Sequence, residues 1–154
     1  MIQRIQSVFL FLVAASMVTM IFFPFWIESS PEQTVSVDIY MIKVMGSNEQ
    51  LTSSTLSYVF IPAALIFVLS IFSITRFKNR LTQIKLGAIN SLLLVIAVGL
   101  TIYLVNQSEA IITETNGQYS IGFYCFIAAM FFNLLANRFI RKDEKLVKSI
   151  DRIR

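Results

Sequence analysis

The sequence predicts an all-α membrane protein whose four helices form an antiparallel transmembrane bundle. The first observation is composition: of 154 residues, 56% are hydrophobic and 14% are charged, and the mean hydropathy is +0.71. Soluble domains carry charge on about a quarter of their residues, so this composition indicates a membrane protein. The second observation is a set of four long apolar segments. The length is that of one domain, so residues 1–154 are expected to form a single membrane unit.

A helix that crosses a membrane needs about 20 mostly apolar residues, because about 30 Å of hydrocarbon is covered at 1.5 Å per residue. Four segments without Asp, Glu, Lys or Arg meet this requirement. The predicted spans cover about residues 7–27, 56–75, 86–105 and 119–137. Cleavage of the first segment as a signal peptide would leave Met17 to Trp26 as an exposed apolar tail, so we expect this span to be retained.

The basic residues predict the orientation of these spans. All but one of the 13 basic residues lie before residue 7, between residues 76 and 85, or after residue 137, and only Lys43 lies in the other connections. The positive-inside rule places the basic side in the cytoplasm, so both termini are expected there. Aromatic residues of the kind found at membrane interfaces mark the opposite boundary of each span: Trp26, Tyr58, Tyr103 and Tyr119.

The connection between the first two spans, residues 28–55, is expected to be a small extracytoplasmic loop. Its residues 34–45 are rich in β-branched side chains and partly alternate, and Pro31 precedes them while Gly46 follows. This pattern predicts one short strand or a hairpin arm. The strand either caps the helices or adds to the sheet edge of a partner subunit, because a single strand cannot bury both of its faces.

Residues 138–154 form a basic cytoplasmic tail that contains no glycine or proline, so the last helix is expected to continue into it. Apolar residues recur at spacings of three and four, and basic residues flank them. Such a helix lies on anionic lipid, or it docks on a cytoplasmic partner. The residues expected to make these contacts are Arg141, Lys142, Lys145, Leu146, Val147, Ile150 and Ile153.

Polar residues inside the predicted spans are amides and hydroxyls. Asn90 lies near the inner end of the third span, and Asn133 and Asn137 lie near the inner end of the fourth. A side-chain amide that faces lipid is costly, so we expect these amides to pair across the two helices. The specific expectation is a hydrogen bond from Asn90 to Asn133 or Asn137.

The composition also excludes several kinds of site. The chain has no histidine and one cysteine, which excludes an intrachain disulfide, histidine-ligated haem and most catalytic zinc sites. Cys125 lies in an apolar run and has no histidine partner, so it is interpreted as a packing residue. We therefore expect no catalytic residues, no cofactor and no metal.

Three stretches, together with the four apolar segments, resemble a family of short bacterial four-pass membrane proteins classed as a domain of unknown function. They are Met1–Gln6, the stretch from Lys78 to Asn90, and Ile140–Arg154. The family implies no activity, cofactor or catalytic residue. Because all three stretches lie on the predicted cytoplasmic side, the resemblance implies a shared partner or lipid contact there.

The sequence thus predicts a non-catalytic accessory, assembly or scaffold subunit of a bacterial inner-membrane complex. The expected partners are anionic lipid headgroups and other membrane protein subunits, with no nucleic acid. A small channel or carrier for an uncharged or lipid-like solute is the alternative, because hydroxyls and carbonyls can line a path. An enzyme is the third reading, and it would require chemical groups supplied by another chain.

Overall fold

A computed structural model describes residues 2–31, 33–46, 58–76, 79–109 and 117–151 of the chain. These residues form four helices and four short strands. The elements are α1 (Ile2–Thr19), β1 (Trp26–Ser29), β2 (Gln33–Val37), β3 (Ile42–Gly46), α2 (Phe60–Thr75), α3 (Arg80–Glu109), β4 (Gln118–Tyr119) and α4 (Ile121–Asp151).

The predicted fold class is wrong, because the structure combines four helices with a four-stranded antiparallel sheet. Among the residues that the structure describes, two helical segments are long and apolar enough to cross a membrane, Arg80–Ser108 and Ile121–Val147. The other two helices contain 18 and 16 residues. At 1.5 Å per residue they extend about 27 and 24 Å, which is short of a hydrocarbon core of about 30 Å.

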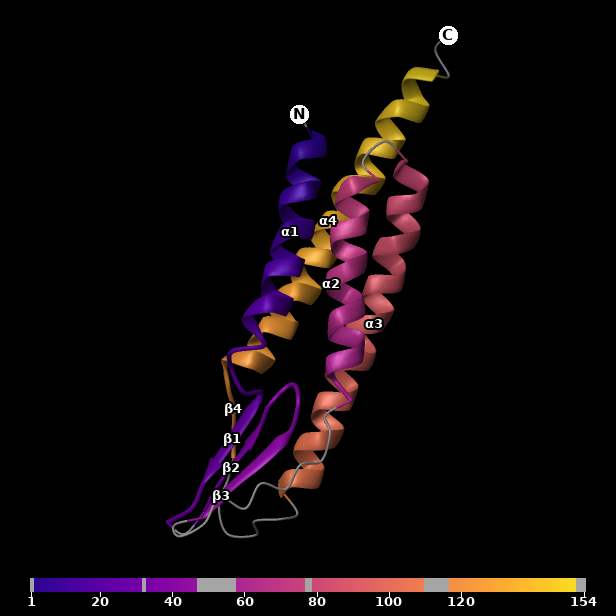
Figure 1. Ribbon diagram of the computed structural model, residues 1–154. Coiled ribbons are helices and arrows are strands. Elements are labelled where there is room, and N and C mark those ends of the chain that lie inside the picture. Colours follow the sequence, from indigo (N-terminus) through magenta and orange to yellow (C-terminus); the bar gives the residue numbers. More distant parts are fainter. Residues whose placement is uncertain (1, 32, 47–57, 77–78, 110–116, 152–154) are drawn as a thin grey trace.

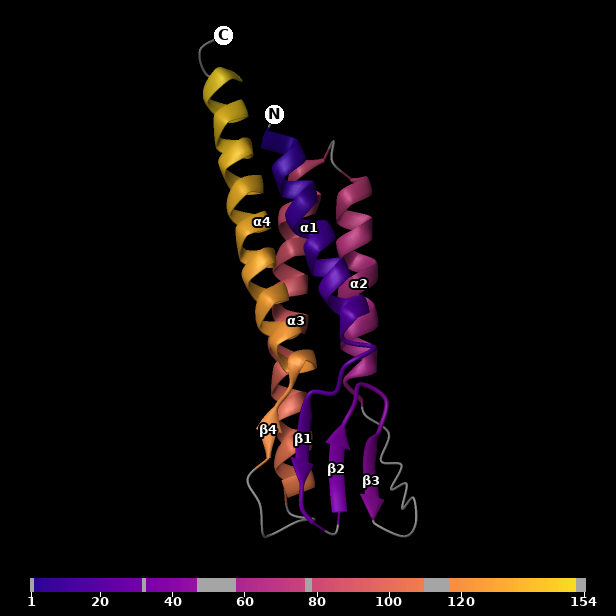
Figure 2. The same cartoon turned by 90° about the vertical axis from the view of Figure 1, so that its left-hand side faces the viewer.

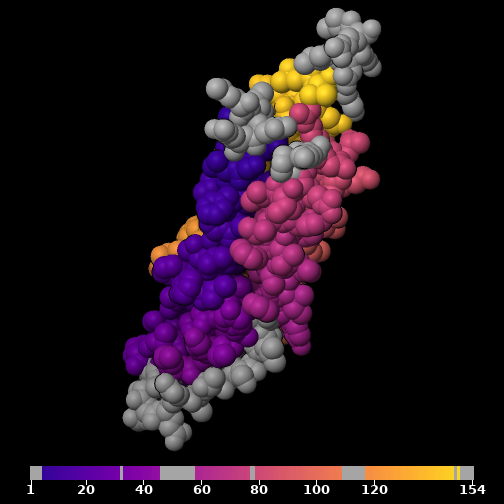
Figure 3. Space-filling model, turned by 45° about the horizontal axis from the view of Figure 1, so that its top comes forward, coloured from indigo at the N-terminus to yellow at the C-terminus, as the bar shows by residue number. Residues whose placement is uncertain are grey.

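The four helices pack side by side, and the sheet lies at one end of them (Figure 1). Helix α1 contacts α2 and α4, and α3 contacts the same two helices. The start of α1 and the end of α4 lie at the end of the molecule opposite the sheet (Figures 1 and 2). The space-filling view shows an elongated molecule in which α1 and α2 lie against each other on one face (Figure 3).

The first predicted span ends early because the chain turns before Pro24. Proline has no backbone N–H to donate, and its ring disfavours a continued helix. After this turn, the N–H of Phe25 donates to the carbonyl of Val37 at 2.7 Å, and the N–H of Ser120 donates to the carbonyl of Phe25 at 2.8 Å. The last part of the predicted span therefore belongs to the sheet. Trp26, expected at the membrane interface, is 1% exposed.

The sheet has the strand order β3-β2-β1-β4, and every pairing in it is antiparallel. Strands β2 and β3 form a hairpin in which Val35 pairs with Val44 and Val37 with Ile42. These four side chains are buried, while Ser36 and Lys43 are half-buried on the other face. The prediction for residues 34–45 was one short strand or a hairpin arm, and the structure has two paired strands there. Strands β1 and β4 each cross the boundary between a predicted span and a predicted loop.

The interior is continuous from the helices into the sheet. One cluster of buried apolar residues joins Val13 and Met17 of α1, Leu94 and Leu104 of α3, and Trp26 of the sheet. Strand β2 contacts α3, whose length lets it run beside both the other helices and the sheet. Residues 47–57, which contain the start of the second predicted span, lie outside the described part of the chain.

Candidate functional site

Six buried polar side chains lie in the half of the helices away from the sheet, whereas Thr101 and Ser108 of α3 and Glu28 of β1 are buried nearer the sheet. Apolar residues such as Leu94, Ala97, Phe126 and Ala129 fill the other half. We call the polar set the polar core. Its buried members are Gln6 on α1, Ser70 and Ser73 on α2, Gln83 and Asn90 on α3, and Asn133 on α4.

Two hydrogen bonds of the polar core join α2 to α3. The side-chain amide of Asn90 donates to the hydroxyl of Ser70 at 2.9 Å, and both side chains are fully buried. The amide of Gln83 donates to the backbone carbonyl of Ser73 at 2.9 Å. The two bonds hold the antiparallel pair α2 and α3 together at two levels.

A third amide joins α3 to α4. Asn133 donates to the hydroxyl of Ser91 at 2.8 Å and to the carbonyl of Gly87 at 3.2 Å. The expected bond from Asn90 to Asn133 or Asn137 is not formed, because the side-chain oxygens of all three lack a hydrogen-bond donor. Asn90 points to α2 instead. A sequence alone identifies amides that need partners, but it does not say which neighbouring helix supplies them.

Amide oxygens of the polar core remain available to an additional donor. The side-chain oxygens of Gln83, Asn90, Asn133 and the neighbouring Asn137 are buried without a hydrogen-bond donor. For Gln6, the amide oxygen lacks a donor and the amide nitrogen lacks an acceptor. An unmade hydrogen bond of this kind costs about 1–3 kcal/mol. Amides do not titrate, so these side chains can bind water or another polar group at any ordinary pH.

An ion pair lies beside the polar core, at the start of α3. The guanidinium of Arg80 lies 3.0 Å from the carboxylate of Asp143 on α4, and the two side chains are 22% and 13% exposed. Arg80 is the first residue of α3, so the residues of α4 that follow Asp143 extend beyond the start of α3.

The predicted contact residues of the tail divide into two groups. Arg141, Lys142 and Lys145 line a groove between α3 and α4, described below, and are exposed. Leu146 and Val147 are 45% and 37% exposed on the projecting part of α4. The side chain of Ile150 and all of Ile153 lie outside the described part of the chain.

The groove between α3 and α4 has a volume of about 630 Å³. Four basic side chains line it, Arg138, Arg141, Lys142 and Lys145, all of them from α4. A second hollow of about 120 Å³ continues from it, and both are lined by Ser91 and Leu134. We call the two together the α3–α4 groove. Sequence reasoning found three of the basic residues but not the groove, because it depends on how α3 packs beside α4.

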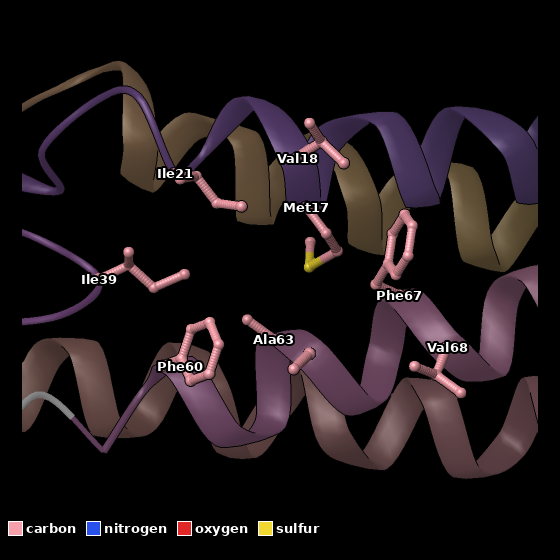
Figure 4. Close-up of a pocket in the computed structure, with 9 residues that line it drawn as sticks. Met17, Val18, Ile21, Ile39, Phe60, Ala63, Phe67 and Val68 are labelled. Carbon is pink, nitrogen blue, oxygen red and sulfur yellow. The ribbon is translucent and has the colours of Figure 1, made fainter.

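An apolar pocket of about 230 Å³ lies between α1 and α2, close to the sheet. The pocket is surrounded by Met17 from α1, Ile21 from the turn after α1, Phe60 and Ala63 from α2, and Ile39 from the connection between β2 and β3 (Figure 4). The pocket is lined by apolar side chains throughout. Sequence reasoning missed it, because nothing in the apolar runs distinguishes residues that line a pocket from residues that fill a core.

Comparison with known families assigns the chain to one of them. The profile of a family described as a domain of unknown function, DUF4293, matches residues 2–153. The chain therefore belongs to this family, as the resemblance of its three basic-side stretches implied. Curated proteins provide no match.

Proposed function

We propose that this member of the DUF4293 family is a non-catalytic accessory, assembly or scaffold subunit of a bacterial inner-membrane complex. The observation that carries the proposal is the projecting end of α4. The helix continues without a break to Asp151, past the level of the Arg80–Asp143 ion pair, and it presents Leu146 and Val147 to the surroundings. Exposed apolar side chains on a basic helix are typical of a surface that docks on a partner.

In this proposal α3 and α4 cross the membrane, and α1 and α2 lie beside them. The sheet lies on the extracytoplasmic side, and the start of α1 and the end of α4 lie in the cytoplasm. The asymmetric distribution of basic residues supports this orientation, since Arg76, Arg80, Lys85 and the basic residues of the α4 end occur at the end away from the sheet.

The interior also supports a structural role. In the polar core, the amides of Gln83, Asn90 and Asn133 donate to neighbouring helices, and the buried carboxylate of Asp143 lies beside this core, paired with Arg80. Ionisable residues at depth are the usual mark of transporters and proton relays. Interhelical hydrogen bonds of the kind seen here instead fix how helices pack in a membrane.

The test is mild-detergent extraction of the tagged protein at native expression, followed by sizing and mass spectrometry. We expect the protein to migrate with one stoichiometric membrane assembly. The double variant Leu146→Asp, Val147→Asp should release the partner while the protein stays in the membrane fraction. Leu81→Asp, which changes an exposed residue at the start of α3, is the matched control and should keep the partner. A wild-type protein that migrates alone would contradict the proposal.

The apolar lining of the pocket between α1 and α2 favours a second function, that of a small channel or carrier for an uncharged or lipid-like solute (Figure 4). A carrier would open this pocket to water during its cycle. Single cysteines at Ala63 and Met17, in a Cys125→Ser background, would react with a water-soluble maleimide if the chain is a carrier. A scaffold subunit should leave both unlabelled, while a cysteine at exposed Gln118 on β4 reacts in either case.

A further inference from the structure

The α3–α4 groove combines a basic region with an apolar one along a single line. Helix α4 supplies the basic region through Arg138, Arg141, Lys142 and Lys145. Ser91 and Leu134 line both hollows, and beyond them the groove is lined mainly by apolar side chains that include Val95 and Met130. The groove is thus polar near the projecting end of α4 and apolar toward the middle of the helices.

The charge of the basic region is largely uncompensated within the described part of the groove. Four of its eight lining residues are cationic and none is acidic. The same stretch of α4 carries two carboxylates, Asp143 and Glu144, and neither lines the groove. Asp143 is paired with Arg80 at 3.0 Å. An anion that entered the groove would therefore meet guanidinium and ammonium groups with little competition from carboxylates.

Backbone and small side chains give the groove its depth. Ala88 on α3 forms part of the wall, and its neighbour Gly87 lets Asn137 of α4 approach the backbone. Larger residues at these positions would fill the space between the helices. The depth therefore depends on two particular small residues and on the close packing that they permit.

We infer that the α3–α4 groove binds one anionic phospholipid. Its phosphate would contact Arg138, Arg141 and the two lysines, since guanidinium groups match phosphate oxygens and lysines add charge. One acyl chain would follow the apolar continuation past Leu134 toward Met130. The hydroxyl of Ser91 and the amide of Asn137 lie along the groove, where glycerol oxygens and a headgroup hydroxyl would be placed.

The apolar continuation distinguishes a lipid from a soluble anion. Inorganic phosphate would use the basic side chains and leave the hollow beside Val95 and Met130 empty. A phospholipid uses both regions, and it is present at high concentration wherever α3 and α4 cross a bilayer. The inference rests on the proposed membrane insertion of these helices, but it does not depend on a partner subunit.

Native mass spectrometry of the full-length protein in detergent tests the inference. Phosphatidylglycerol and phosphatidylcholine with identical acyl chains are added in turn, and the adducts are counted. We expect one tightly held phosphatidylglycerol and much weaker phosphatidylcholine. Each basic residue contributes about fivefold to binding at an anionic surface, so Arg141→Gln, Lys142→Gln should weaken the first adduct by about 30-fold.

Two further variants separate charge from shape. Arg76→Gln, Lys85→Gln removes the same charge from the same end of the molecule at residues that do not line the groove, and it should change the adduct less than threefold. Ala88→Phe keeps all charges but fills the groove, and it should remove the adduct. Circular dichroism and the detergent melting temperature identify any variant that has not folded.

Three results would overturn the inference. One is equal binding of the two lipids, and another is an unchanged adduct in the folded Arg141→Gln, Lys142→Gln variant. The third is displacement of phosphatidylglycerol by millimolar inorganic phosphate, which would show that the groove binds an anion rather than a lipid. Extraction of the wild-type protein from membranes by sodium carbonate alone would instead contradict the proposed insertion, so the two failures are distinguishable.

Discussion

Gly87 on α3 lies directly against the side chain of Asn137 on α4. A Cβ atom at position 87 would be 1.8 Å from the Oδ1 atom of Asn137. The carbonyl of the same glycine accepts a hydrogen bond from Asn133 at 3.2 Å. A tight contact between α3 and α4 is thus also the place where a backbone carbonyl of α3 accepts a hydrogen bond from α4.

We expect Gly87→Ala to destabilise the protein by about 1–3 kcal/mol, because the new methyl group forces the Asn137 amide out of position. The measurement is the free energy of unfolding in a detergent titration. Gly99→Ala on the same helix is the matched control, since a Cβ there meets nothing within 4 Å. The Gly99→Ala variant should have an unchanged free energy of unfolding, or one higher by up to about 1 kcal/mol, because alanine has a better helix propensity than glycine.

The clash also predicts a rescue. Asn137→Ala removes the atoms that the new methyl group would meet, so the double variant Gly87→Ala, Asn137→Ala should recover part of the lost stability. The same titration measures it. If the destabilisation of the double variant equals the sum of the destabilisations of the two single variants, the two residues are not coupled and the contact does not contribute to stability.

The bond from Asn133 to Ser91, at 2.8 Å, should appear as a coupling between the two positions. Alanine at both positions, compared with each single variant, should give an interaction energy of about 0.6 kcal/mol, the average for hydrogen bonds between membrane helices. The pair Asn90 and Ser70 should behave in the same way. Asn133 and Ser70, which share no hydrogen bond in the described structure, should be additive within about 0.5 kcal/mol.

The Arg80–Asp143 ion pair should contribute modestly to stability. Its side chains are 22% and 13% exposed, so screening by water reduces the attraction to about 1 kcal/mol. A cycle of Arg80→Gln and Asp143→Asn, measured by thermal unfolding at low and high salt, should show coupling that decreases as salt increases. Coupling that is the same at both salt concentrations would indicate a hydrogen bond in place of a charge effect.

Gly117 controls the position of Trp26, whose ring would lie 1.8 Å from a Cβ at residue 117. Trp26 is the single tryptophan of the chain and is 1% exposed. Gly117→Ala should therefore shift the fluorescence emission to longer wavelength and increase quenching by acrylamide. Gln118→Ala alters an exposed neighbour on β4 and should leave both signals unchanged.

The sequence predicted the long apolar helices well and the sheet poorly, for a physical reason. Helices α3 and α4 contain the apolar runs 86–105 and 119–137 almost entirely. Residues Phe25 and Trp26 extend another apolar run, but a fully buried strand and a helix segment have the same apolar content over a few residues. Pro24 was the signal that separated them.

Strand β4 has only two residues, Gln118 and Tyr119, and no local pattern can predict a strand of that length. It exists because Tyr119 pairs with Trp26, a contact between segments far apart in the chain. The candidate site shows the same limit. Amides such as Asn90 and Asn133 were identified from their depth in apolar runs, while their partners and the α3–α4 groove depend on how the helices pack.

The strand order β3-β2-β1-β4 has a consequence for how the protein is made. Strand β1 follows the first helix and its partner β4 precedes the last one, so one edge of β1 stays open until most of the chain has been synthesised. An open edge is a template for pairing with other chains. Pairing across such a separation closes a large loop and is slow. The pairing of β1 with β4 is therefore expected to form late in folding. A chain that stops before residue 118 would leave that edge of β1 open to pairing with other chains.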